Sequence, residues 1–126
     1  MCDLALRKGD VYYADLDGFR GHEQGGVRPV LILQNNIGNK YAPTTLVAPL
    51  TTSITKKPMP MHVKLSGYEY GLKQDSTVLL EQIRAIDKCR LKGYLASIDK
   101  DKMYEIDKRT AIVFGLEGKP ASIVAA

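Results

Sequence analysis

Several features that mark common protein classes are scarce in this chain. It has no tryptophan and two cysteines, and Cys2 and Cys89 stand far apart in no metal-type spacing, which predicts reduced thiols rather than a disulfide framework. No apolar run is long enough to cross a membrane. The N-terminal charges follow a very short apolar stretch, whereas a secretory signal needs them before a longer one. We therefore expect a cytoplasmic protein with no membrane partner.

Signatures of cofactor and metal enzymes are also missing. The sequence has no phosphate-binding loop, no nucleotide fingerprint and no Ser/His/Asp order. Asp15 and Asp17 share a predicted strand face, and Asp99 with Asp101 begins a predicted helix. Neither pair has a third carboxylate or a histidine at useful spacing. The sequence thus predicts no metal site and no cofactor.

Length and composition are those of an ordinary globular protein. The 126 residues are 44% hydrophobic and 25% charged, which predicts one domain spanning residues 1–126. The net charge of +4 favours anionic partners only where one face concentrates it. The sequence has two clusters of basic residues, and a solvated protein surface is the more common explanation of each cluster. They are Lys56, Lys57 and Lys64, and Arg84, Lys88, Arg90 and Lys92.

Short runs of β-forming residues separated by polar turns predict a mainly β fold. The predicted strands are 11–16, 27–33, 46–50, 61–65, 77–81 and 83–86, and the loops between them include 17–26, 36–44 and 52–60. After Tyr94 the period becomes helical, with Asp99 as N-cap and Gly115 as C-cap. The apolar stripe of that helix predicts core or subunit interface: Met103, Ile106, Thr110, Val113 and Phe114. Strands followed by one helix favour a small barrel.

The run from Glu23 to Val30 is the most informative local motif. Gly25 and Gly26 adopt positive φ readily and let a ligand approach the backbone, while Arg28 carries a planar fork that matches a phosphate. These residue types suit a phosphodiester. On residue types alone, a turn followed by a solvated charge explains the same run.

The motif stands in an ordered set that closely resembles the MazF/PemK family of toxin endoribonucleases, from about Gly9 to Leu91. The matching segments are 7–16, 23–39, 43–51 and 79–88. The resemblance implies an SH3-like small barrel of the CcdB/PemK type with short helices and a C-terminal helix. It also implies a sequence-specific, metal-independent endoribonuclease that cleaves single-stranded mRNA by 2′-hydroxyl attack. Such a toxin inhibits growth, forms a homodimer and is controlled by a MazE-type antitoxin.

Carried over residue by residue, the resemblance assigns Arg28 and Thr51 as catalytic and Glu23 to the same site. Arg28 supplies two donors for phosphoryl oxygens, and Thr51 offers a hydroxyl that donates or accepts. A guanidinium is a poor base at neutral pH, so Glu23 is the better candidate for the base. Alone, Thr51 would be an ordinary residue at a strand end.

The family match and the residue types together predict a set of RNA-binding residues, although an irregular loop explains Met59 and Pro60 equally well. A glutamine amide reads base edges of a splayed single strand, and an apolar loop supports a base. The histidines can move a proton near neutral pH, although a core or surface role is the more common one for His62, and His22 replaces the serine that relatives often have. The predicted set is His22, Gln24, Met59, Pro60, His62, Glu81, Gln82 and Arg84.

Two other functions stay open at this point. A CcdB-like protein would use the same barrel to inhibit DNA gyrase without catalysis, but such proteins use a C-terminal tryptophan, which this chain lacks. An SH3-like adaptor would need a groove of exposed aromatics to bind peptides. With aromatic residues at only 7% of the chain, that signal is weak.

Overall fold

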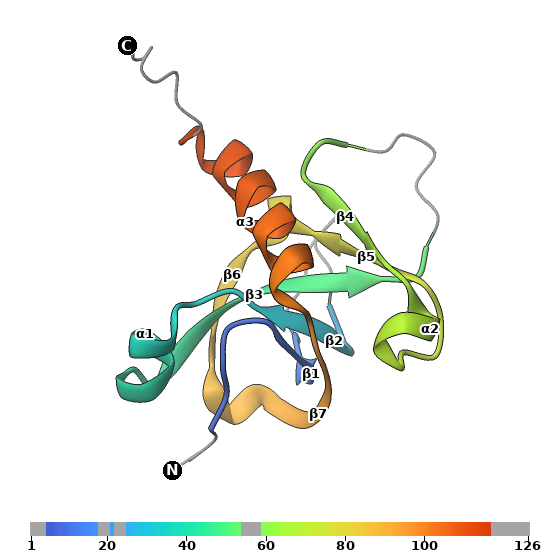
Figure 1. Ribbon diagram of the computed structural model, residues 1–126. Helices are drawn as coiled ribbons and strands as arrows, with labels where there is room; N and C mark the ends of the chain where they lie inside the picture. Colours follow the sequence, from blue (N-terminus) through green and yellow to red (C-terminus); the bar gives the residue numbers. More distant parts are fainter. Residues whose placement is uncertain (1–4, 18–20, 22–24, 54–58, 117–126) are drawn as a thin grey trace.

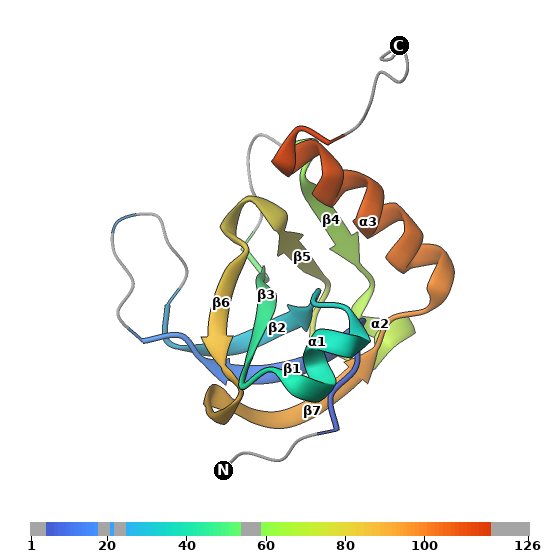
Figure 2. The same cartoon turned by 90° about the vertical axis from the view of Figure 1, so that its left-hand side faces the viewer.

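A seven-stranded antiparallel sheet forms most of the part of the chain that the structure describes (Figure 1). The computed structural model describes residues 5–17, 21, 25–53 and 59–116. The strands are β1 (Asp10–Asp15), β2 (Val27–Ile32), β3 (Thr44–Thr51), β4 (His62–Leu65), β5 (Ser76–Leu79), β6 (Arg84–Asp87) and β7 (Leu91–Ser97). Their spatial order is β4-β5-β3-β2-β1-β7, with β6 pairing β3. The strands curl into a small, partly open barrel, which confirms the predicted mainly β fold (Figure 2).

Strand β3 lies at the centre of this arrangement and changes partner along one edge. Its first half pairs with β6, from Thr44 opposite Asp87 to Val47 opposite Arg84, and its last two residues pair with β5. Pro49 lies at the change, and proline has no N–H to continue a ladder. The two ends of β3 therefore have different surroundings.

Two apolar clusters fill the two sides of the sheet. Leu31 and Leu50 belong to one cluster, together with Met103 and Ile106 of the terminal helix. Val30 and Ile32 belong to the other. The unbroken apolar run of β2 is thus explained by burial on both of its faces.

Within the described ranges, three α-helices flank the sheet: α1 (Asn36–Tyr41), α2 (Gly67–Tyr70) and α3 (Lys100–Phe114). Each begins with a side-chain cap, from Asn35, Ser66 and Asp99 respectively. Helix α3 contacts β4 (Figure 2). Asp99 accepts from the Lys102 N–H and Gly115 ends the helix at φ 67°, so the predicted caps are confirmed. Of the predicted stripe, Met103 and Ile106 are buried and Phe114 is 57% exposed.

The structure corrects several sequence-based boundaries. Helix α1 lies in the predicted loop 36–44, because Asn35 caps it, and β7 was not predicted at all. Two short 3-10 helices, η1 (Leu80–Gln82) and η2 (Lys88–Arg90), interrupt the strand pattern. The predicted strand 77–81 consequently ends at Leu79. In the described part of the chain, no helix is long and apolar enough to cross a bilayer.

The prediction of reduced thiols is wrong for Cys89, which is disulfide-bonded in the structure. Cys2, the chain's other cysteine, lies outside the described residues. Wide separation in sequence did not predict pairing, because distance along the chain says nothing about distance in the fold.

Candidate active site

Arg28 lies on β2 directly after a tight turn. Gly26 has φ +74°, a conformation that glycine adopts without strain, and its carbonyl accepts the Leu16 N–H at 2.9 Å. The half-buried Arg28 side chain donates from Nε to the Gly25 carbonyl at 2.8 Å. Within the described residues its two terminal nitrogens have no protein partner. The turn thus orients the guanidinium and leaves its two terminal nitrogens available to a ligand.

Thr51 is the last residue of β3 and is 8% exposed. Its Oγ1 accepts the Ser53 N–H at 3.1 Å. Among the residues that the structure describes, this hydroxyl has no acceptor for its own proton. A hydroxyl fixed by an incoming hydrogen bond can still donate to a bound group.

The sheet register brings these two residues together. Val30 pairs with Pro49 in the antiparallel ladder between β2 and β3. The ladder ends at this pair, and Arg28 lies two residues before Val30 while Thr51 lies two residues after Pro49. The fold therefore places the two predicted catalytic residues at one end of one pair of strands.

A second pair of predicted residues meets nearby in the fold. His62 of β4 contacts Glu81 of η1, with 3.0 Å between Nε2 and Oε2. The side chains are 7% and 30% exposed, so Glu81 is the more accessible partner. Nδ1 of His62 is buried and has no hydrogen-bond partner among the described residues. Burial on this side makes His62 suited to holding the Glu81 carboxylate in place.

The remaining predicted residues are dispersed. Met59 is 41% exposed, and the Pro60 carbonyl accepts from Nη1 of Arg109 on α3 at 2.7 Å. Gln82 belongs to η1, and Arg84 begins β6. The predicted residues His22, Glu23 and Gln24 lie outside the described residues.

The structure removes Lys88 from the predicted cluster of basic residues around Arg84. It is 7% exposed, and its ammonium donates to the backbone carbonyl of Asn39. A buried ammonium needs such an acceptor to compensate for lost hydration. Lys88 therefore supports the fold, and it belongs neither to a solvated surface nor to a basic face open to a ligand.

Away from Arg28 and Thr51, shifted pKa values are found for Tyr70 and Asp99. The Tyr70 hydroxyl donates to this carboxylate and lowers its pKa, and the Lys102 N–H contributes in the same direction. Burial and the same carboxylate raise the pKa of Tyr70. The described residues contain no group of three or more His, Cys, Asp or Glu side chains that could hold a metal ion.

Residues 7–114 match the family described as PemK-like, MazF-like toxin of type II toxin-antitoxin system. The chain belongs to this family. An endoribonuclease MazF of Staphylococcus epidermidis is 51% identical over 111 residues, which cover 88% of this chain and 92% of that protein. The resemblance inferred from the sequence motifs is confirmed.

Solved structures of PemK/MazF-like toxins have the same fold. A mycobacterial endoribonuclease in complex with its cognate antitoxin is 28% identical, with a TM-score of 0.74 over 90% of this chain and 99% of that one. MazF from Deinococcus radiodurans is 26% identical, with a TM-score of 0.75 over 90% and 99% of the two chains.

Sequence reasoning did not select Thr77, a polar neighbour of Thr51. It pairs directly with Thr51 across β3 and β5. The two residues are far apart in sequence, and only the strand register reveals the contact. Lys64, which pairs with Thr77 from β4, was noted only as part of a basic concentration.

Proposed function

We propose that this toxin is a sequence-specific endoribonuclease that cleaves single-stranded mRNA without a metal ion and thereby inhibits growth in the cytoplasm. The observation that supports the proposal is that Arg28 and Thr51 lie at the same end of β2 and β3, each two residues beyond the paired Val30 and Pro49. The S. epidermidis relative, 51% identical, is an endoribonuclease, which supports the same reaction for this chain.

In the proposed reaction the 2′-hydroxyl of one nucleotide attacks the adjacent phosphorus. A 2′-O–P bond forms, the P–O5′ bond breaks, and the product is a 2′,3′-cyclic phosphate with a free 5′-hydroxyl. Glu23 accepts the 2′-hydroxyl proton, and the leaving 5′-oxygen takes up a proton from solvent. No outside oxidant or co-reactant is needed.

Arg28 and Thr51 stabilise the charge that develops on the phosphoryl oxygens. The Nε of Arg28 is held by Gly25, so the two terminal nitrogens are the donors offered to the substrate. Thr51 adds a hydroxyl donor from the neighbouring strand. Donors that are already positioned need no reorganisation during the reaction, and each typically contributes about 10²- to 10³-fold to the rate.

Base recognition is assigned to the predicted loops 17–26 and 52–60 and to η1. Glu81 and Gln82 offer an acceptor and an amide for base edges, and His62 holds the Glu81 carboxylate at 3.0 Å. Met59 supplies an exposed apolar surface for a base. His22, Gln24, Pro60 and Arg84 complete the proposed RNA-binding set.

Two partners are proposed beside the RNA. One is a second copy of the chain, because two copies would join their basic faces into one groove. The other is an acidic antitoxin of the MazE type that occupies this groove. A mycobacterial endoribonuclease of this fold is found with its cognate antitoxin, which supports such a partner here.

Cleavage of a long single-stranded RNA by the purified protein tests the proposal. We expect cutting to continue in EDTA, with 5′-hydroxyl ends and 2′,3′-cyclic phosphates at a recurring sequence. A substrate with a single 2′-deoxy nucleotide at the cut site lacks the nucleophile and should stay intact. Cutting of that substrate would show that water attacks instead. Absence of any RNA cleavage would favour a non-enzymatic toxin such as a gyrase inhibitor.

Competition tests the proposed antitoxin site. An acidic antitoxin peptide should displace a non-cleavable RNA from the toxin, with RNA affinity falling in proportion to occupancy. A stable complex of toxin, peptide and RNA with unchanged RNA affinity would require an allosteric route instead.

A further inference from the structure

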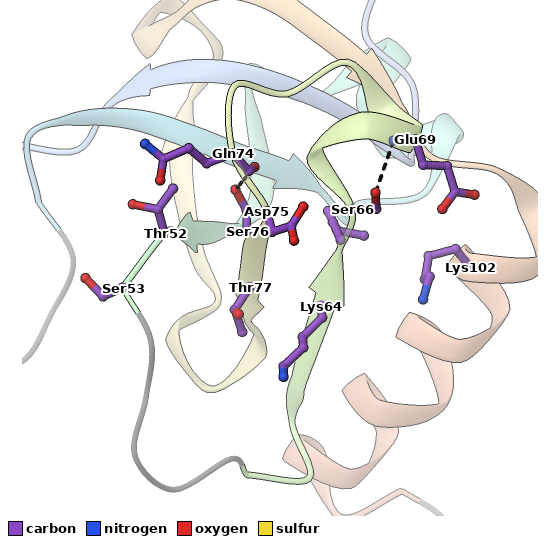
Figure 3. A pocket seen from close by; sticks show the side chains of 11 residues that line it. Thr52, Ser53, Lys64, Ser66, Glu69, Gln74, Asp75, Ser76, Thr77 and Lys102 are labelled. Atoms are coloured by element: carbon purple, nitrogen blue, oxygen red, sulfur yellow. Dashed lines mark hydrogen bonds between the residues drawn. The ribbon is translucent and has the colours of Figure 1, made fainter.

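A groove of about 920 Å³ lies beside the end of β3, immediately after Thr51 (Figure 3). Thr52 and Ser53 border it where the chain leaves β3, and Lys64 and Thr77 border it from β4 and β5. On the α3 side it is bordered by Lys102. None of these residues belongs to the catalytic pair, and the proposed chemistry leaves the groove without a role.

The floor of this groove is continuous with the catalytic pair through the sheet register. Thr51 pairs with Thr77, and Thr77 pairs with Lys64, so the three residues form one row across β3, β5 and β4. Neighbouring strands lie about 4.8 Å apart, which puts the Lys64 backbone about 10 Å from that of Thr51. Figure 3 shows Thr77 and Lys64 side by side on their strands.

This row points away from the apolar cluster that contains Leu50. The adjacent row, Leu50, Val78 and Val63, belongs to an apolar core cluster. Successive side chains of a strand alternate between faces, so the row with Lys64 faces the opposite side. Exposure increases along it, from buried Thr51 through half-buried Thr77 to exposed Lys64.

Charges around the groove make Lys64 its available cation. Within the described residues Lys64 has no hydrogen-bond or ion-pair partner, whereas Lys102 pairs with Glu105 at 3.1 Å. The Asp75 carboxylate accepts the Gly67 N–H at 2.8 Å. Glu69 lies on the α3 side of the groove, near Lys102 and away from Thr77 (Figure 3). An anionic chain that runs from Thr51 into the groove therefore passes the Thr77 hydroxyl first and the Lys64 ammonium next.

The groove keeps its shape through a close backbone contact. A Cβ on Gly67 would lie 2.7 Å from the Gln74 carbonyl carbon, so only glycine lets α2 approach the loop before β5 this closely. Tyr70 of α2 donates a hydrogen bond to Asp99 at the start of α3. The wall opposite β3 is thus fixed before any ligand binds.

We propose that Thr77 and Lys64 bind a phosphodiester that flanks the cleaved one, so that the RNA backbone runs from Arg28 and Thr51 across β5 and β4 into the groove. This inference rests on the proposed function and names further substrate-binding residues for it. Phosphates fix the register of a nucleic acid on a protein, so this contact positions the scissile bond at Arg28.

Binding of a non-cleavable RNA, with one 2′-deoxy nucleotide at the cut site, tests the inference. Lys64→Ala should weaken binding about 5- to 10-fold and reduce the salt slope of log K by about 0.7, the value for one phosphate contact on a single strand. Lys64→Arg should restore most of both. Lys40→Ala on α1, which also removes an exposed lysine but does not border the groove, should change affinity by less than about 2-fold.

Neutral linkages locate the contact. Methylphosphonates are placed one at a time on each side of the cut site, and cleavage by the wild type and by Lys64→Ala is compared. At one position the neutral linkage should abolish the difference between the two proteins. If Lys64 sensitivity persists with every neutral linkage, the contact is not to a flanking phosphate and the inference is wrong.

The controls separate this inference from the proposed function. If the wild type does not cleave RNA, the proposed function fails. If the wild type cleaves but Lys64→Ala behaves like Lys40→Ala, the flanking-phosphate site alone is wrong. That site is also wrong if Lys64→Ala weakens only the binding of an acidic antitoxin peptide and leaves RNA binding unchanged.

Discussion

Each end of β3 has a threonine on the strand and a lysine on a neighbouring element, yet the surroundings of the two ends differ. At the first end, the Thr45 hydroxyl donates to Oδ1 of Asn39 at 2.9 Å, and Lys88 donates to the Asn39 carbonyl. Thr45 is fully buried. At the other end, Thr51 accepts from Ser53, and Lys64 is exposed at the groove. The same residue types build the fold at one end and offer donors at the other.

The difference comes from what each donor meets. Asn39 is 2% exposed, and its polar atoms satisfy both Thr45 and Lys88, so that end has no donor left for a ligand. In the described part of the chain, Thr51 and Lys64 have no protein acceptor. Buried polar groups are costly unless they are paired, so the unpaired hydroxyl proton of Thr51 indicates binding more than stability, while exposed Lys64 is solvated until a ligand enters the groove.

Of the substitutions considered, Arg28→Ala should lower the cleavage rate the most. We expect cleavage to fall at least about 100-fold, because the variant lacks the donors for the developing phosphoryl charge. The free energy of unfolding should change little, since Arg28 lies near the start of β2, is only half-buried and makes one side-chain hydrogen bond, to Gly25, within the described residues. Arg28→Lys keeps the positive charge but lacks the paired N–H donors of the guanidinium, so it should retain only part of the wild-type cleavage rate. A folded Arg28→Ala protein with near wild-type cleavage would remove Arg28 from the site.

Lys88→Met tests the opposite end of β3. The substitution keeps most of the apolar stem but leaves the buried Asn39 carbonyl without its donor, which should cost about 1–3 kcal/mol in the free energy of unfolding. Cleavage per folded molecule should stay within about 2-fold of the wild type. Urea unfolding and RNA cleavage measure the two effects. Lys92→Met, at an exposed position of β7, is the matched control and should change stability little. Lost RNA affinity with unchanged stability would mean that Lys88 binds RNA after all.

Acid unfolding should reveal a smaller effect at the groove wall. The Tyr70 hydrogen bond lowers the pKa of Asp99 below its ordinary 3.8 in the folded protein. Its contribution to stability is therefore complete above that ordinary value and is lost as the pH falls through the lower, folded-state pKa. Asp99→Asn keeps an acceptor for the Lys102 N–H but has no charge to titrate. Between about pH 5 and about pH 3 the wild type should lose more stability than Asp99→Asn. Equal losses would show that Asp99 is not linked to folding.

Local signals in the sequence predicted much of the fold. Asp99 and Gly115 bounded α3 correctly, because caps are set by neighbouring residues. Strand β7 was missed, since it mixes glycine and lysine with its apolar residues and gives no clean alternation. The two ends of β3 also look alike in sequence, and neighbours from other elements distinguish Thr45 from Thr51 and Lys88 from Lys64.

In the candidate site too, the residue types could be chosen from the sequence, whereas their arrangement in space could not. Arg28 and Thr51 were selected from a family resemblance, whereas their placement at one end of the sheet follows from register, a property of the folded chain. Thr77 could not be selected from sequence for the same reason. The pairing of His62 with Glu81 joins two residues that had been assigned separately.

The most direct test of this contrast compares Thr45→Val with Thr51→Val, since each removes one hydroxyl from the same strand with little change in shape. Cleavage rate and free energy of unfolding are measured for both, with Thr51→Ser as a variant that keeps the hydroxyl. We predict that Thr51→Val lowers cleavage about 100-fold at nearly unchanged stability, while Thr51→Ser retains activity. Thr45→Val should lose about 1 kcal/mol of stability and keep its activity. The reverse pattern, or equal effects of the two valine variants on cleavage, would contradict the assignment of chemistry to one end of β3 and support to the other.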